Sequence, residues 1–379
     1  MTDRPRVVVV GGGFAGFHAA RSLAKRLGGD AEIVVINSTD YFLYLPLLPE
    51  VATSLLEPRR VAVPLAASLP GVRVVLGEVD EIDLEARRVG WVDPEGDRRS
   101  LTYDRLLLTV GSVNKLLPVP GIAEHAHGFR SLAEAMYLRD HITRQIELAS
   151  DTDDPAERNA RCTFVVVGAG YTGTEVAAEG VLFTDDLKKS NRDLDGQPVR
   201  WMLLDLAKRV LPELDPRLSA TADQVLRKRG VEVRMGESIE EADHDGVRLT
   251  TGEHVATRTL VWCVGVRADP LVDSLGLKTE RGRVVVDEYM RVPGRPEVFA
   301  CGDAAAVPDV TRPGEATAMT AQHAQRQGKL VGRNIAASLG KGTSRRYKHH
   351  DLGFVVELGG RTPRRTRCTC RSRACRRRR

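Results

Sequence analysis

Two stretches of the chain share one pattern of apolar and polar positions. A β-branched run, Arg6–Val10 in one stretch and Thr163–Val167 in the other, leads directly into a glycine-rich turn and then into a plausible helix. Continuous β-branched runs are typical of strands buried on both faces of a parallel sheet. The pattern therefore predicts two strand–turn–helix units, the first with a helix over residues 17–27.

The remaining pattern extends both units into an α/β fold. Apolar runs at 32–36 and 199–204 predict a second strand in each unit, and 319–339 has helical periodicity. We expect two Rossmann-like dinucleotide-binding domains, the first discontinuous and the second inserted into it. The expected boundaries are 1–125 with 280–345 for the first domain, 155–279 for the second, 346–360 for a remnant of a C-terminal region, and 361–379 for a disordered tail.

The glycine turns carry the chemical signal. Each reads G-x-G-x-x-G, with glycines at positions 11, 13 and 16 and at 168, 170 and 173. The first glycine permits a tight turn, the second lets backbone approach a pyrophosphate, and the third lets the helix pack on the strand. Helix N-termini also attract phosphate. Two such units in one chain indicate two bound dinucleotides and electron transfer between them.

The residue that ends the second strand differs between the units. This position commonly holds an acid that accepts hydrogen bonds from ribose hydroxyls. The first unit has Asn37, whose uncharged acceptor makes a weaker bond. The second unit has Asp205, whose charge disfavours a 2′-phosphate, although Lys208 and Arg209 follow it closely.

The segment 41–49 is aromatic and contains two prolines. It holds three of the 7 Tyr and 8 Phe residues. The prolines predict a loop rather than a helix. Two interpretations stay open, a loop tucked against the core and a loop packed along a flat cofactor ring.

Composition narrows the class of protein. An apolar content of 42% with 28% charged residues is typical of a soluble globular chain. We expect neither a signal peptide nor a membrane span. Before residue 361 the cysteines Cys162, Cys263 and Cys301 form no C-x-x-C or C-x4-C pair. Disulfide-reductase chemistry, which needs a redox dithiol, is therefore disfavoured.

The final segment, 361–379, departs from the rest. It contains ten arginines and no acidic residue. The net charge of the whole chain is +5, and that of residues 1–360 is therefore −5. It has no hydrophobic period, so we expect disorder and a changed terminus, such as a shifted reading frame. Its cysteines, Cys368, Cys370 and Cys375, lack a histidine or surrounding fold for zinc. We expect no metal site and no specific nucleic-acid partner.

Besides the two fingerprints, six shorter motifs follow one another along the chain. They are Leu45-Pro46-Leu47-Leu48, Thr109-Val110-Gly111, Gly173-Thr174-Glu175, Trp262-x-x-Gly265-Val266-Arg267, Gly302-Asp303-Ala304 and Ala321-Gln322-x-Ala324-x-x-Gln327-Gly328. Together these motifs resemble the type II NADH:quinone oxidoreductases, single-chain enzymes that do not pump protons. The resemblance covers roughly residues 5–360, and the chain departs from the family at Asn37, at Arg326 and at the tail.

The resemblance implies roles for these residues. It places Glu175 beside the nicotinamide and flavin, and Gln322 near the flavin at the quinone side. The residues alone favour simpler interpretations, in which Glu175 is a first-turn helix acid and Gln322 is a polar helix position. The resemblance implies FAD contacts from Gly11, Gly13, Gly16, Asn37, Pro46, Leu47, Gly111, Asp303 and Ala304, and NAD contacts from Gly168, Gly170, Gly173, Asp205 and Gly265.

The implied activity is FAD-dependent oxidation of NADH with two-electron transfer to a membrane quinone. The implied setting is the respiratory chain, at the cytoplasmic face of the membrane if the C-terminal anchor were intact. The oligomeric state stays open, with a homodimer as one possibility. Two alternatives stay open. One is an NADH-dependent reductase of another carrier, such as a ferredoxin-like protein, and the other is a non-catalytic flavin-binding protein.

Overall fold

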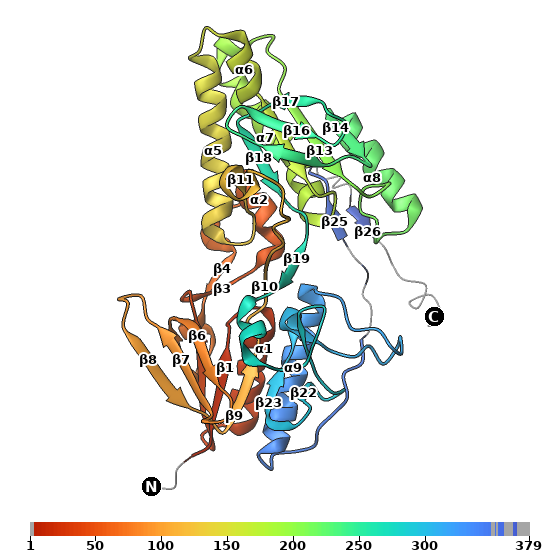
Figure 1. Cartoon of the computed structure of the whole chain (residues 1–379). Helices are drawn as coiled ribbons and strands as arrows, with labels where there is room; N and C mark the ends of the chain where they lie inside the picture. Colours follow the sequence, from red (N-terminus) through yellow and green to blue (C-terminus); the bar gives the residue numbers. More distant parts are fainter. Residues whose placement is uncertain (1–3, 350–352, 354, 360–366, 370–379) are drawn as a thin grey trace. The chain divides into compact units, whose positions relative to one another are not determined.

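The computed structural model describes residues 4–349, 353, 355–359 and 367–369. The chain divides into two compact units (Figure 1). Unit 1 comprises residues 1–44, 62–113 and 266–350, and unit 2 comprises residues 45–61, 114–265 and 351–379. Each unit is therefore assembled from separate parts of the chain. The predicted disorder of the tail falls outside the described residues, except at the short strand β26 (Arg367–Thr369).

Unit 1 is built on a six-stranded sheet. Strands β5, β2, β1, β9 and β23 are parallel neighbours, and β22 pairs antiparallel at the edge. The bounds are β1 (Arg6–Val10), β2 (Glu32–Asn37), β5 (Arg73–Leu76), β9 (Arg105–Leu108), β22 (Arg291–Val292) and β23 (Arg295–Ala300).

Helices α1 (Phe14–Leu27) and α9 (Ala321–Ser338) pack against each other in unit 1 (Figure 1). Helix α1 begins three residues before the predicted start, directly after Gly13. The smaller elements are β3 (Tyr41–Leu43), β4 (Ala62–Pro64), α3 (Leu65–Ser68), β6 (Glu78–Asp83), β7 (Arg88–Val92), β8 (Arg98–Thr102), β19 (Val266–Ala268), η4 (Pro270–Leu275), β20 (Thr279–Glu280), β21 (Arg283–Val285), η5 (Gly302–Ala304) and β24 (Ala305–Ala306).

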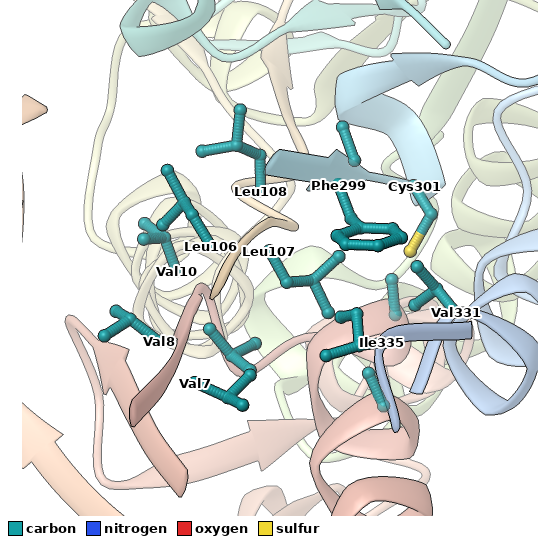
Figure 2. Packing of buried hydrophobic residues seen from close by; sticks show 14 of the residues in the cluster. Val7, Val8, Val10, Leu106, Leu107, Leu108, Phe299, Cys301, Val331 and Ile335 are labelled. Atoms are coloured by element: carbon teal, nitrogen blue, oxygen red, sulfur yellow. The ribbon is translucent and has the colours of Figure 1, made fainter. Parts of the chain in front are cut away.

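The core of unit 1 explains its apolar runs. Figure 2 shows valines of β1 and leucines of β9 beside Phe299 of β23. Val331 and Ile335 of α9 complete the packing. Val7, Val8 and Leu107 have no exposed surface, as expected for strands covered on both faces.

Unit 2 contains a five-stranded parallel sheet in the order β11-β18-β12-β13-β14. Its strands are β11 (Ala126–His127), β12 (Thr163–Val167), β13 (Arg200–Asp205), β14 (Val231–Met235) and β18 (Thr259–Trp262). A second, antiparallel sheet contains β15 (Ile239–Ala242), β16 (Gly246–Leu249) and β17 (His254–Ala256). Strand β10 (Ser112–Asn114) lies where the chain passes from unit 1 to unit 2.

The helices of unit 2 show where the sequence patterns were misleading. Helix α7 (Tyr171–Lys189) continues through a charged stretch, residues 185–189, that has no apolar period. The proline-containing segment predicted as a loop forms η1 (Leu45–Leu47) and helix α2 (Leu48–Ala52), because a proline is tolerated in the first turn. The others are η2 (Pro58–Arg60), α4 (Ile122–His125), α5 (Leu132–Ser150), α6 (Pro155–Arg161), η3 (Arg192–Leu194) and α8 (Pro216–Lys228), with strand β25 (Val355–Glu357) beside β26.

No described helix combines the length and the apolar character needed to cross a bilayer.

Candidate functional site: two glycine cradles and a buried acidic cluster

The first fingerprint is shaped by close backbone contacts in unit 1. Gly11 has φ +95°, and a Cβ there would lie 2.4 Å from the Thr109 carbonyl oxygen. A Cβ on Gly16 would lie 1.8 Å from the carbonyl oxygen of Gly11. Gly13 differs, since a Cβ there would have no described heavy atom within 4 Å. Only glycine fits the two packed positions, and the open position leaves backbone accessible to a ligand.

Helix α1 begins at this open position without a side-chain cap. Its N-cap is Gly13, and its first turn contains no acidic residue. The first N–H groups of a helix have no intrahelical partner. They and the positive end of the helix dipole suit an anion such as a pyrophosphate.

Asn37 ties this turn to the end of β2. Its Oδ1 accepts a hydrogen bond from the Gly12 N–H at 2.7 Å, and its Nδ2 donates to the Thr39 carbonyl at 2.8 Å. A cavity of about 140 Å³ opens at the same strand ends. It is lined by Val10, Gly11, Ile36, Asn37, Ser38, Gly77, Glu78, Val79, Val110, Asp269 and Leu271.

Three more predicted residues of unit 1 lie on the loops that follow β9 and β23. Ser112 Oγ donates to Asp303 Oδ2 at 2.5 Å, next to Gly111, which has φ +79°. Ala304 is fully buried in η5. The structure thus brings Gly111 and Asp303 together, although they are far apart in sequence.

Sequence reasoning assigned no role to Gln327, which holds the Gly302 turn. Its Oε1 accepts from the Gly302 N–H at 2.8 Å, and its Nε2 donates to Thr317 Oγ1 at 2.9 Å. The sequence feature that could have identified Gln327 is its place in the α9 motif, five residues after Gln322.

The predicted site residue Gln322 is half-buried in the first turn of α9.

We call each fingerprint turn, residues 11–16 in unit 1 and 168–173 in unit 2, together with the start of its helix a glycine cradle. The cradle in unit 2 has the same geometry as the one in unit 1. Gly168 has φ +107°, and a Cβ there would lie 2.3 Å from the Cys263 carbonyl oxygen. A Cβ on Gly173 would lie 1.9 Å from the Gly168 carbonyl oxygen, whereas Gly170 is open. Helix α7 begins directly after Gly170, again without a side-chain cap. The same anion-binding geometry therefore occurs twice.

Asp205 takes the place that Asn37 has in unit 1. Its Oδ2 accepts from the Ala169 N–H at 2.6 Å, and its Oδ1 accepts from the Ala207 N–H at 2.7 Å. Arg209 donates to the Pro212 carbonyl at 2.7 Å. Its guanidinium is therefore engaged by backbone carbonyls. Gly265, with φ +83°, follows β18 in the same unit.

Pro46 and Leu47 lie in η1 of unit 2, Pro46 exposed and Leu47 half-buried. Leu48 and Val51 of the adjoining α2 are buried. The segment thus packs through α2, and Pro46 remains open to the surface.

Glu175 and Glu179 of α7 are one helical turn apart and largely removed from water. Glu175 Oε1 accepts the backbone N–H of Glu357 at 3.0 Å. Burial, reinforced by the charge of Glu50, raises the pKa of Glu175 to about 8. Burial, again with Glu50 as the largest charge contribution, raises the pKa of Glu179 to about 9. Both side chains can therefore hold a proton at neutral pH.

Glu179 was missed at the sequence level. It is 1% exposed, and its Oε2 lies 3.0 Å from Thr53 Oγ1. Its other oxygen, Oε1, has no hydrogen-bond partner in the described part of the chain. The available signal was its spacing of four residues from Glu175, which places both on one helix face.

The thiols of Cys162, Cys263 and Cys301, whose side chains the structure describes, are free. Burial raises the pKa of each thiol, to about 12 for Cys263. A neutral, buried thiol is a poor nucleophile.

Comparison with known proteins identifies the family. Residues 5–328 match the pyridine nucleotide-disulphide oxidoreductase family. Over 322 residues the chain is 36% identical to the type II NADH:quinone oxidoreductase NdhA of Mycobacterium tuberculosis, covering 81% of this chain and 67% of the relative. Over 349 residues it is 34% identical to Ndh of the same organism, covering 89% and 73%.

The chain belongs to the type II NADH:quinone oxidoreductases. Its fold matches the structure of NDH2 from Plasmodium falciparum in complex with NADH, with a TM-score of 0.86 at 16% identity. That match covers 94% of this chain and 89% of the other. The predicted α/β fold with two dinucleotide-binding units is confirmed.

FAD and NAD(H), the cofactors characteristic of this family, fit the two cradles. In unit 1 the open Gly13, the uncapped α1 and the cavity beside Asn37 suit a pyrophosphate with its adenosine. In unit 2 Gly170, α7 and Asp205 provide the equivalent groups. Which cradle takes which dinucleotide, and the role of each predicted site residue, remain predictions.

Proposed function

We propose that the chain oxidises NADH through bound FAD and passes two electrons to a membrane quinone, without pumping protons. The observation that carries the proposal is the pair of complete glycine cradles in a chain 36% identical to a type II NADH:quinone oxidoreductase. The free thiols of Cys162, Cys263 and Cys301, whose pKa values are raised by burial, support a quinone rather than a disulfide as acceptor.

The proposal assigns FAD to unit 1 and NADH to unit 2. In unit 1 Gly11, Gly13 and Gly16 would hold the pyrophosphate, while Asp303, oriented by Ser112, would hold the ribityl and phosphate region. In unit 2 the corresponding residues would be Gly168, Gly170, Gly173 and Asp205. Bound FAD would accept a hydride from NADH and release two electrons to the acceptor.

Two side chains of the protein would serve the quinone. The Gln322 amide would donate a hydrogen bond to a quinone carbonyl. Glu175 would donate a proton, since its raised pKa of about 8 keeps it protonated at neutral pH. The use of a membrane quinone implies contact with the membrane surface.

The test follows the flavin absorption band of purified protein mixed anaerobically with NADH, before and after addition of a soluble quinone. Rapid bleaching followed by rapid recovery is the expected result. Bleaching that recovers only with a protein carrier, such as a ferredoxin-like protein, would transfer the proposal to that acceptor. Bound flavin that NADH does not bleach would contradict the enzyme function.

A further inference from the structure

The hydroxyl of Thr53 defines how Glu179 is held. Thr53 Oγ1 lies 2.9 Å from the Pro49 carbonyl oxygen and 3.0 Å from Glu179 Oε2. A hydroxyl has one proton to donate, and a carbonyl oxygen can only accept. With that proton directed to Pro49, Thr53 Oγ1 faces Glu179 as an acceptor. The contact then requires a proton on Glu179.

The surroundings of Glu179 offer little to an ionised carboxylate. Glu179 is 1% exposed, and Oε1 has no hydrogen-bond partner among the described residues. Burying a carboxyl group with one unpartnered oxygen disfavours the ionised form far more than the neutral acid. The unpartnered oxygen is therefore consistent with the protonated form.

The charged groups that act on Glu179 lie on α2, on α7 itself, on β25 and at the end of α8. They are Glu50 of α2, Glu175 of α7 itself, Glu357 of β25 and Arg229, which caps α8. The three acids all disfavour a further negative charge. Arg229 donates to the Gly359 carbonyl, and no described ion pair joins it to Glu179. The net effect of these neighbours is to retain the proton.

We propose that Glu179 is a positioning residue for the proton chemistry of Glu175: a neutral carboxylic acid that donates to Thr53 and resupplies Glu175 with a proton. The inference rests on the proposed function, in which Glu175 delivers a proton to a quinone. It adds a second proton store one helical turn away on α7.

The proton balance explains why a second store is useful. Reduction of a quinone to a quinol consumes two electrons and two protons, whereas a hydride carries two electrons and one proton. One further proton is needed per turnover, and Glu175 gives it up as its O–H bond breaks and the quinol O–H bond forms. Glu179 then transfers its proton to the Glu175 carboxylate and is reprotonated from solvent.

The first experiment is an infrared pH titration of the full-length, FAD-loaded protein, without NADH or quinone. The C=O stretching band of protonated carboxylic acids reports the neutral form, and E179Q assigns the contribution of Glu179. In the wild type this band should persist at pH 7. Its absence at pH 7, or its persistence unchanged in E179Q, would overturn the proposal.

The substitution Thr53→Val distinguishes donation by Glu179 to Thr53 from donation by Thr53 to Glu179, because the pKa of Glu179 shifts in opposite directions in the two cases. If Glu179 donates, losing the acceptor lowers the pKa of Glu179 by about half a unit to one unit. If Thr53 donates to an ionised Glu179, losing the donor raises that pKa, and the proposal fails. Thr53→Ser keeps the hydroxyl and is the matched control, expected to leave the titration unchanged.

The second experiment measures flavin reoxidation by a soluble quinone as a function of pH. In E179Q the rate should fall by about tenfold above pH 8, where Glu175 can no longer be resupplied, and E179D should restore part of it. An unchanged pH profile in E179Q would overturn the proposal. A wild type that no quinone reoxidises refutes the proposed function, while the infrared titration still decides the state of Glu179.

Discussion

The two cradles have the same backbone geometry but different chemistry at the strand that supports them. Asn37 and Asp205 each place one oxygen on the backbone N–H of the second fingerprint residue, at 2.7 Å and 2.6 Å. Asn37 uses its amide nitrogen to donate to the Thr39 carbonyl, whereas Asp205 accepts a second N–H, from Ala207. The turn thus needs an acceptor oxygen but no charge, and the charge of Asp205 is available for discrimination between ligands.

The helices that follow the cradles differ in a second way. Helix α1 contains no acidic residue, and the α1 side chains that face the unit 1 core are apolar or small. Helix α7 carries Glu175 and Glu179, both with raised pKa values. The two carboxyl groups that this rise brings near neutral pH therefore both lie in unit 2, and we expect changes of pH to affect the two units differently.

The largest expected effect comes from adding a methyl group at a packed glycine. Gly16→Ala places Cβ 1.8 Å from a carbonyl oxygen, so the turn must move. We expect loss of flavin and a loss of unfolding free energy of more than about 3 kcal/mol, measured by flavin content and urea unfolding.

Two controls sharpen this prediction. Gly13→Ala has open space around it, so the apoprotein should stay within about 0.5 kcal/mol of wild type while flavin binding weakens. Gly173→Ala should retain flavin and lose NADH binding. Loss of flavin in Gly173→Ala, with normal flavin content in Gly16→Ala, would reverse the assignment of the cradles.

The next effect is a dependence of stability on pH that arises in unit 2. Glu175 and Glu179 have folded-state pKa values of about 8 and about 9, above their unfolded values of about 4.3. Between these limits the folded state binds more protons, so stability is greatest at low pH and falls as pH rises. Each group contributes about 1.4 kcal/mol per pH unit within its window.

Urea unfolding at several pH values between 5 and 8 checks this slope, with E179Q predicted to reduce it by about 1.4 kcal/mol per pH unit. Glu147→Gln on the surface of α5 is the matched control and should leave the slope unchanged. An E179Q slope equal to that of the wild type would show that Glu179 is ionised.

A smaller effect is expected when the second cradle is made chemically like the first. Asp205→Asn keeps an acceptor for the Ala169 N–H but removes the negative charge. We expect the ratio of kcat/KM for NADH to that for NADPH to fall by about tenfold, which is about 1.4 kcal/mol. A ratio that stays constant would mean that Asp205 serves only the turn.

The reciprocal change should have the smallest effect. Asn37→Asp retains the acceptor for the Gly12 N–H but replaces the donor to the Thr39 carbonyl with an oxygen. We expect a loss of about 1 kcal/mol in unfolding free energy and retained flavin. Thermal unfolding with and without added FAD measures both, and loss of flavin would show that charge at this position matters in unit 1 as well.

Local patterns in the sequence were sufficient to predict the supporting frame. The strands β1 and β12, both glycine turns and the helices after them lie where the apolar runs and fingerprints predicted. The prediction for the segment around Pro46 was wrong, because the helix that follows, α2, has only five residues and is too short to show a period.

The amino-acid sequence by itself determined the two strand–glycine–helix units and the glycines that their tight turns require. It also determined the amide at the end of β2 and the acid at the end of β13. These features are local, since a few consecutive residues specify each of them. Only the tertiary structure decided that Thr53 meets Glu179 across 126 residues and that the Glu357 N–H meets Glu175 across 182. Burial and neighbouring charge, which change the protonation of an ordinary helix glutamate, arise from packing between distant segments and leave no periodic mark in the sequence.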